Sequence, residues 1–184
     1  MSSFKEFASV ISMDVQASTG RRGLTAVLSA LIYEPGFSYV FFHRIAVLLY
    51  SGGLPRFGKF IWKRNSVRYG CYLHLHAKIA GGLKLPHPVG VVVGEGVEIE
   101  EWVTLYQGVT LGKGSAQNTY PTIGTRTTVF ANAIVFGAVR IGSNAVIGAG
   151  AIVNKPVTGG DVVAGNPAKS IHSTPIYVEV SGTQ

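Results

Sequence analysis

The sequence is poor in cysteine, in acidic residues and in long apolar runs. Its 184 residues include one cysteine, Cys71, which excludes an internal disulfide and favours a reducing compartment. Asp and Glu number 9 against 16 Lys and Arg, and the net charge of +7 favours anionic ligands such as phosphates. The most apolar window, residues 37–50, contains His43 and Arg44 and is too short to span a bilayer. The first residues lack the basic segment and apolar run of a secretory signal, so we expect a cytoplasmic protein.

What the sequence does contain is a repeat of six residues. Aliphatic side chains recur at every sixth position between residues 93 and 153, with one double step of twelve residues between Leu111 and Ile123. A second row of small or apolar residues follows four positions after the first. Helices and strands repeat every 3.6 and 2.0 residues, so neither explains this period. The first row is Val93, Ile99, Leu105, Leu111, Ile123, Val129, Val135, Ile141, Ile147 and Val153; the second is Val97, Val103, Val109, Thr127, Ala133, Val139, Ala145, Ala151 and Val157.

A period of six is typical of a coil of short parallel strands, in which one aliphatic residue per hexad points inward and stacks on the next turn. Glycine follows the aliphatic residue in five hexads, where a corner needs a small residue or an unusual backbone angle. The alternative is an ordinary β-sandwich of alternating strands.

The rest of the chain divides around this repeat. Residues 1–70 are predicted to be an N-terminal tail and helical region: residues 1–20 form a tail or loosely docked arm, and helical spacing follows over 24–31, 37–50 and 57–68. The coil is predicted over residues 71–171, with the polar segment 113–122 leaving it as an external loop and two extra residues between Leu85 and Val93. Residues 172–184 form a C-terminal tail, and the segment from Asp161 onward closes the open end of the coil.

Five basic residues gather in the third predicted helix, between Arg56 and Arg68, among aromatic side chains. This pattern fits a solvated helix face. It also fits peripheral contact with an anionic membrane, such as the inner face of the cytoplasmic membrane. No nucleic-acid-binding motif accompanies the charges, so we expect no nucleic-acid partner.

Several motifs together resemble the serine acetyltransferase branch of the hexapeptide-repeat acyltransferases, which includes related enzymes that acetylate sugars. They are PGF and HRIA in the helical region, YLHLHAKIAGGLKLPHPVGVVVGE, LYQGVTLG and AGNPAKSI, and they span about residues 34–171. The resemblance implies a mainly β fold, a left-handed parallel β-helix with an N-terminal α-helical region. It also implies a homotrimer that holds acetyl-CoA in a groove between two adjacent copies.

His87 is the first candidate for catalysis. It lies between Pro86 and Pro88 at the two-residue offset, and an imidazole can take a proton from a hydroxyl near neutral pH. A structural role remains the alternative from the residues alone, but by the resemblance His87 corresponds to the general base. Glu95 is the candidate that orients it, or else an exposed turn residue.

Other residues are candidates for binding. The acceptor candidates are Tyr72, His74, Tyr106, Gln107 and Tyr120. The acetyl-CoA candidates, by the resemblance, are Gly112, Ala131, Ala149, Lys155 and Lys169. His74, His76 and His87 show no metal-ligand motif, so we expect no metal site.

The chain departs from serine acetyltransferases at three places. In that branch an aspartate directly precedes the catalytic histidine, a second orients it from the preceding turn, and an Arg-His pair meets the serine carboxylate. The corresponding residues here are Pro86, Tyr72 and Thr119-Tyr120. A zwitterion would lack partners, so we expect the acceptor to be a sugar hydroxyl in a polysaccharide or its lipid-linked precursor. Serine as acceptor and a non-catalytic β-helix scaffold are the alternatives.

Overall fold

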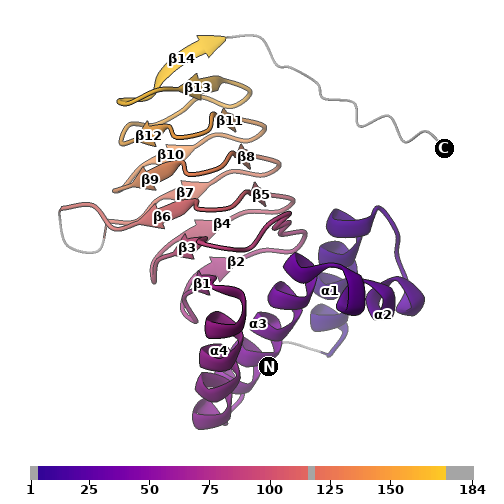
Figure 1. The fold of residues 1–184 in the computed structure, drawn as a ribbon. Helices are drawn as coiled ribbons and strands as arrows, with labels where there is room; N and C mark the ends of the chain where they lie inside the picture. The colour runs from indigo at the N-terminus through magenta and orange to yellow at the C-terminus, as the bar shows by residue number, and fades with distance from the viewer. Residues whose placement is uncertain (1–3, 116–118, 173–184) are drawn as a thin grey trace.

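The computed structural model describes residues 4–115 and 119–172, and shows four helices at one end of a coil of short strands (Figure 1). The helices are α1 (Phe4–Thr19), α2 (Leu24–Tyr33), α3 (Pro35–Ser51) and α4 (Pro55–Tyr69). The strands are β1 (Tyr72–Leu73), β2 (Lys78–Ile79), β3 (Val92–Val93), β4 (Glu98–Ile99), β5 (Thr104–Leu105), β6 (Thr110–Gly112), β7 (Thr122–Ile123), β8 (Thr128–Val129), β9 (Ile134–Phe136), β10 (Arg140–Ile141), β11 (Val146–Ile147), β12 (Ile152–Val153), β13 (Val162–Ala164) and β14 (Lys169–His172). The predicted fold class is confirmed: a left-handed parallel β-helix with an N-terminal helical region.

Three sheets form the sides of the coil, and all their strand pairs are parallel except that of β13 with β14. Sheet I has the order β1-β3-β6-β9-β12, sheet II β2-β4-β7-β10 and sheet III β5-β8-β11-β13-β14. In sheet I, Val92 pairs with Thr110, eighteen residues on, so three hexads make one turn. Tyr72 pairs with Val92 across twenty residues, and Thr110 with Ile134 across twenty-four. These longer steps confirm the two predicted extra residues before Val93 and show that extra residues also lie between β6 and β9, where the external loop is predicted.

Both predicted rows of side chains fill the interior of the coil. Every member of the first row is at most 2% exposed, and every member of the second at most 8%. Val93 lies in register on Leu111, and Leu111 on Val135, so the aliphatic stack is continuous from turn to turn. Burying one such side chain contributes about 1.5–3 kcal/mol. The six-residue repeat therefore identified the core residues correctly.

The three helices predicted after residue 20 are confirmed, and proline and glycine set their boundaries. α3 and α4 each begin with a proline, which needs no N–H partner in the first turn. α4 ends at Gly70, whose φ of 57° and ψ of 34° are left-handed and whose N–H bonds to the Ser66 carbonyl. This turn leads directly into β1. No helix in the described ranges is by itself long and apolar enough to cross a membrane; α2 and α3, bent by 111°, reach that length and composition only as a pair.

The structure differs from the expectation for residues 1–20, because residues 4–19 form the helix α1 and not a loosely docked arm. Asp14 in α1 is fully buried, and its carboxylate accepts the backbone N–H groups of Gly82 at 2.8 Å and Leu83 at 3.0 Å. Arg44 of α3 pairs with Asp14 at 3.1 Å and also donates to backbone carbonyls of the first coil turn. A buried carboxylate with these partners anchors α1, although hydrophobic patterning does not reveal it.

Two further boundaries differ slightly from those predicted. The external loop ends before Thr122, which already belongs to β7. β14 extends through His172 and pairs antiparallel with β13, so it closes the open end of the coil as expected from residue 161 onward. The predicted tail beyond His172 lies outside the described residues.

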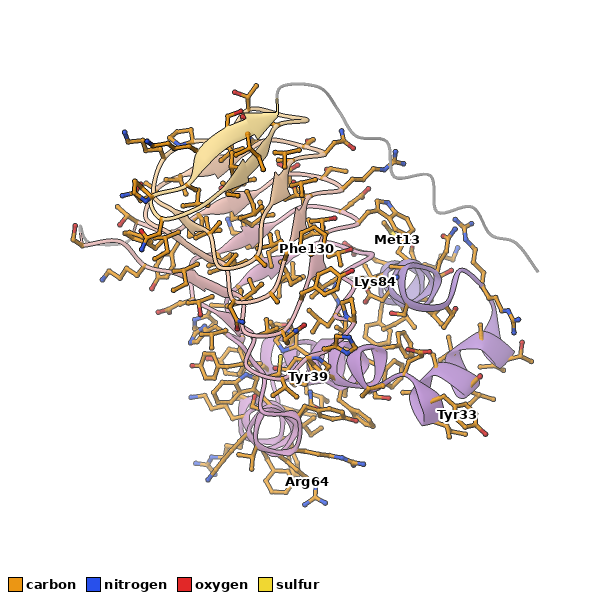
Figure 2. All side chains as sticks on the ribbon, turned by 45° about the horizontal axis from the view of Figure 1, so that its top comes forward. Met13, Tyr33, Tyr39, Arg64, Lys84 and Phe130 are labelled. Carbon is orange, nitrogen blue, oxygen red and sulfur yellow. The ribbon has the colours of Figure 1, made fainter. Side chains whose placement is uncertain are left out.

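Arg64 of α4 lies on the side of the helix away from the coil (Figure 2), whereas Lys59 and Lys63 of the same helix line a pocket together with residues of the first coil turn. Phe57 and Phe60 on the same helix are 64% and 63% exposed. Contact of this face with an anionic membrane stays a prediction.

α3 approaches the coil very closely at Gly36. A methyl group at this residue would lie 1.7 Å from the backbone oxygen of Leu85, two residues before His87. The same helix carries Tyr39, whose hydroxyl accepts the Leu73 N–H at 3.0 Å (Figure 2). Since the obstacle at Gly36 is backbone, a side chain there cannot be accommodated by a rotamer change.

Gly36→Ala is expected to lower the free energy of unfolding by about 1–3 kcal/mol, because the helix must move away from the coil. Urea denaturation followed by circular dichroism measures this. The control is Gly112→Ala, whose added carbon would meet only Thr110 Cγ2 at 3.8 Å. Equal stability of the two variants would contradict this account of the junction.

Candidate functional site

The predicted site residues fall mainly on two corners of the coil, one at each edge of sheet I. The first corner joins sheet III to sheet I and comprises residues 86–90, 106–108, 130–132 and 148–150. The second corner joins sheet I to sheet II and comprises 74–77, 94–97, 113–115, 119–121, 137–139 and 154–156.

His87 lies exposed on the first corner, in the two-residue insertion. The segment is fixed on both sides: Gly36 packs on Leu85, and the Gly90 N–H donates to the Gly70 carbonyl at 2.7 Å. Within the described ranges no side chain is hydrogen-bonded or ion-paired to His87. The imidazole is thus held on a rigid backbone and is open to solvent, as a base that meets an incoming substrate must be.

Four further candidate residues lie on the first corner in the turns that follow His87. The N–H of Gly108 bonds to the Val89 carbonyl, that of Asn132 to Gln107, and that of Gly150 to Ala131, so successive turns stack directly. Tyr106 stacks on Phe130 with ring centroids 5.0 Å apart, and the buried Oε1 of Gln107 has no hydrogen-bond donor in the described chain. The four predicted residues Tyr106, Gln107, Ala131 and Ala149 therefore share one column with His87.

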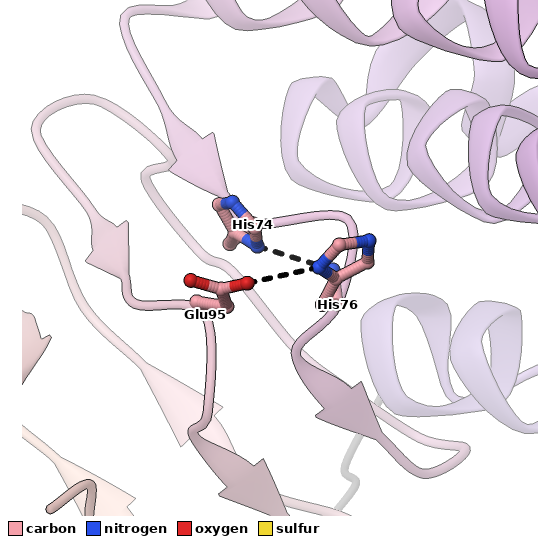
Figure 3. A group of neighbouring side chains, drawn as sticks. All are labelled: His74, His76 and Glu95. Atoms are coloured by element: carbon pink, nitrogen blue, oxygen red, sulfur yellow. Dashed lines mark hydrogen bonds and ion pairs between the residues drawn. The ribbon is translucent and has the colours of Figure 1, made fainter. Parts of the chain in front are cut away.

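His74, His76 and Glu95 meet on the second corner (Figure 3). His76 Nδ1 lies 3.0 Å from Glu95 Oε1, and His76 Nε2 lies 3.2 Å from the Tyr50 hydroxyl. The backbone N–H of His76 donates to His74 Nδ1 at 3.2 Å. Glu95 is therefore held by His76 and not by His87, and the pairing that we predicted for Glu95 is not formed within one chain.

The contacts among these three side chains, together with burial, shift the pKa values of Glu95 and His74. The hydrogen bond from His76 and the nearby His74 lower the pKa of Glu95, so this carboxylate stays ionised at neutral pH. Burial lowers the pKa of His74, while Glu95 opposes that shift. Because His74 Nδ1 accepts a hydrogen bond, His74 is in the neutral form with its lone pair on Nδ1.

A pocket of about 450 Å³ opens at this corner between the coil and the helices α3 and α4. Trp62 of α4 donates its indole N–H to the Leu73 carbonyl at 2.8 Å and meets Tyr72 edge-to-face at 5.2 Å. Tyr72 itself is on the outward face of sheet I, 38% exposed. The residues lining the pocket are Tyr50, Lys59, Trp62, Lys63, His74, Leu75, His76 and Glu95.

Tyr50, Trp62 and His76 also belong to this site, and their place in it was not predicted from the sequence. The sequence does contain a signal for His76. Because the first turn has twenty residues, Glu95 lies over Leu75, which stands between His74 and His76.

The remaining predicted residues are placed as follows. Tyr120 lies against the second corner, because a methyl group on Gly96 would be 2.4 Å from its ring. Gly112 and Lys155 border the same corner, and Lys155 is exposed. Lys169 is in β14, at the far end of the coil from the helices. The acetyl-CoA candidates thus do not gather on one surface of a single chain.

The outward face of sheet I differs from that of sheet II. Sheet I presents Tyr72, Val92 and Ile134, each between 37% and 39% exposed. The first corner adds Val89 and Phe130, which are also exposed. Sheet II presents a charged and polar row: Lys78, Glu98, Thr122 and Arg140. An apolar face of this kind, flanked by the two candidate corners, is typical of a surface that meets another copy.

Two buried groups near the site are unsuited to its chemistry. Burial, with Arg44 and His74 nearby, lowers the pKa of His43 to about 3, so this imidazole is neutral and enclosed. Burial raises the pKa of the Cys71 thiol to about 12, so Cys71 supplies no thiolate nucleophile at neutral pH.

Comparison with known proteins decides the family. The structure of serine acetyltransferase from Brucella abortus in complex with coenzyme A is 32% identical in sequence and superposes with a TM-score of 0.83, covering 93% of this chain and 70% of that one. Neisseria gonorrhoeae serine acetyltransferase in complex with serine is 32% identical, with a TM-score of 0.82 and coverages of 92% and 70%. The chain belongs to the serine acetyltransferase family.

Serine acetyltransferase of Buchnera aphidicola is 34% identical over 147 residues, which are 78% of this chain and 54% of that protein. The chain spans about half the length of the curated relatives it matches first. No family model matches the chain.

These findings overturn our expectation about the acceptor. We predicted a sugar hydroxyl in a polysaccharide or lipid-linked precursor, but these relatives are named for serine. The sugar prediction was therefore wrong, and the alternative of serine fits better. The sugar prediction rested on the absence of polar residues at three positions. That absence shows which groups are missing there, but not which other groups take their place.

Proposed function

We propose that this chain is a serine O-acetyltransferase that takes its acetyl group from acetyl-CoA. The observation that carries the proposal is the exposed imidazole of His87, held on a rigid corner of a fold that superposes on serine acetyltransferases bound to coenzyme A and to serine. A scaffold without activity would have no need of an open imidazole at this position.

The transfer is direct. His87 removes the proton from the serine hydroxyl as the oxygen attacks the thioester carbonyl, and a tetrahedral intermediate forms. Collapse of the intermediate breaks the carbon–sulfur bond, and the imidazolium returns the proton to the departing thiolate. The products are O-acetylserine and coenzyme A. No acyl-enzyme is needed, in agreement with the buried, protonated thiol of Cys71.

A trimer would complete the site. If sheet I of each copy faces a threefold axis, the first corner of one copy meets the second corner of the next. Ala131 and Ala149 would then lie across a groove from Gly112 and Lys155, so the acetyl-CoA candidates would line both walls. The apolar row of sheet I supports this arrangement, because its exposed side chains would be covered.

The second corner would bring its polar side chains next to the partner copy's first corner. Glu95 is ionised and carries a charge that the ammonium group of serine can meet. Lys113 lies close enough to lower the pKa of Glu95 and offers a charge for the serine carboxylate. These groups replace, in part, the charged residues missing at Pro86, Tyr72 and Thr119-Tyr120.

His87→Ala is expected to reduce kcat/KM for serine by about 10² to 10⁴, the usual effect of losing a general base. Release of free thiol from acetyl-CoA in the presence of serine measures the rate. Circular dichroism and coenzyme A binding should match the wild type, because His87 is exposed and bonds to no described side chain. A variant that keeps more than about a tenth of the rate would rule out His87 as the base.

Pro86→Asp is expected to lower KM for serine by about tenfold, because it restores a carboxylate for the ammonium group and one charged hydrogen bond is worth at least about 1.4 kcal/mol. Pro86→Asn is the matched control, similar in size but uncharged, and should leave KM near the wild-type value. If both variants give the same KM, serine does not bind next to residue 86.

Ile134→Lys is expected to convert the trimer, three chains of 19.5 kDa, into single chains and to abolish acetyl transfer, because it places a charge in the apolar row of sheet I. Light scattering after size exclusion measures the mass. Thr122→Lys, on the polar outer face of sheet II, is the control and should remain trimeric and active. An active single chain would refute a site shared between copies.

A further inference from the structure

We propose that His74, His76 and Glu95 form a binding site for a divalent transition-metal ion of the Zn²⁺ type. The ligand atoms of these three side chains all lie within 4.8 Å of one another on the second corner. Two imidazoles and one carboxylate are a donor set that Zn²⁺ accepts, with the fourth position open to water. The proposed acetyl transfer requires no metal, and because it places Glu95 against the ammonium group of serine, Zn²⁺ and serine would compete for this carboxylate.

The geometry needs only small adjustments. Two atoms bound to one tetrahedral Zn²⁺ lie about 3.3 Å apart at ordinary bond lengths. His76 Nδ1 and Glu95 Oε1 are already 3.0 Å apart. Figure 3 shows His74 and Glu95 both directed toward His76. His74 turns its unprotonated Nδ1 in this direction, so a side-chain rotation brings the third ligand to the ion.

The surroundings supply what a metal-bound histidine needs. An imidazole that binds a metal through Nδ1 carries its proton on Nε2 and donates it to an oxygen. The Tyr50 hydroxyl lies 3.2 Å from His76 Nε2 and can accept that hydrogen bond. Tyr50 belongs to α3, so a bound ion would join the first and second coil turns to each other and to the helical region.

The three ligands come from two successive turns of the coil, so the site forms only when these turns stack. His74 and His76 alternate on either side of Leu75, whose side chain is buried and fixes the positions of both neighbours. Glu95 enters from the next turn because this turn contains twenty residues. The side chains of His76 and Glu95 are 50% and 58% exposed, so an ion can reach them from solvent.

Isothermal titration of the full chain, free of any histidine tag and of acetyl-CoA, with ZnCl₂ tests the proposal. We expect one saturable Zn²⁺ per chain, and Co²⁺ in its place should give the intense visible absorption of a tetrahedral site. Mg²⁺ at the same concentration should not compete, since it prefers oxygen ligands.

Variants separate this site from unspecific adsorption. His76→Ala and Glu95→Gln should each weaken Zn²⁺ binding more than tenfold, and Tyr50→Phe about tenfold through loss of the supporting hydrogen bond. Glu98→Gln is the matched control: Glu98 is an exposed carboxylate on the next strand that pairs with Lys78, and its loss should leave affinity unchanged. A folded wild type that binds no Zn²⁺, or an equal loss of affinity in Glu98→Gln and Glu95→Gln, would overturn the proposal. Because Zn²⁺ binding is measured without acetyl-CoA and serine, neither outcome decides whether the chain transfers acetyl groups.

Discussion

The structure depends on the stacking of one aliphatic side chain per hexad on its counterpart in the next turn. Val93, Leu111 and Val135 lie above one another in register, and a shift by one residue would turn this row outward. Because the inward positions are fixed, the polar residues between them are fixed as well. Each corner residue therefore lies over the corresponding residue of the preceding turn, so the polar side chains of one corner form a column along the coil.

Turns that are longer than eighteen residues determine which corner residues lie next to one another. With a step of eighteen residues, position 95 would stack on position 77; the two extra residues shift it to position 75, between His74 and His76. The same insertion places His87 on the opposite edge of sheet I. One irregularity thus exposes the candidate base and assembles the histidine–glutamate cluster on the other corner.

How much of this could be predicted from the sequence differs between core and site. The core rows, the helices after residue 20 and the insertion were all predicted, because each depends on local spacing. α1 was missed because residues 1–20 were taken as weakly patterned, although Ile11 and Val15 lie four residues apart and are buried against α2 and α3. The other contribution to its docking, the buried carboxylate of Asp14 with its partners Arg44 and the backbone of residues 82 and 83, has no signal in local spacing. The pairing of Glu95 with His76 was missed for a different reason: Glu95 was assigned to His87 by its expected role, although the two extra residues before Val93 place Glu95 over residue 75.

The error about the acceptor has a related cause. Pro86, Tyr72 and Thr119-Tyr120 were treated as losses at isolated positions, without regard to the other polar groups on the same corners. The column on the second corner carries Glu95 together with the basic side chain of Lys113, and its charges act on each other. A charged acceptor does not require the same residues in the same places; it requires opposite charges within reach on the same corner. Helix α3 helps to position both corners. Gly36 lets this helix lie against Leu85 near the first corner, and Tyr50 of the same helix contacts His76 on the second corner. α3 therefore touches both edges of sheet I, and a change in its position would alter the two corners together.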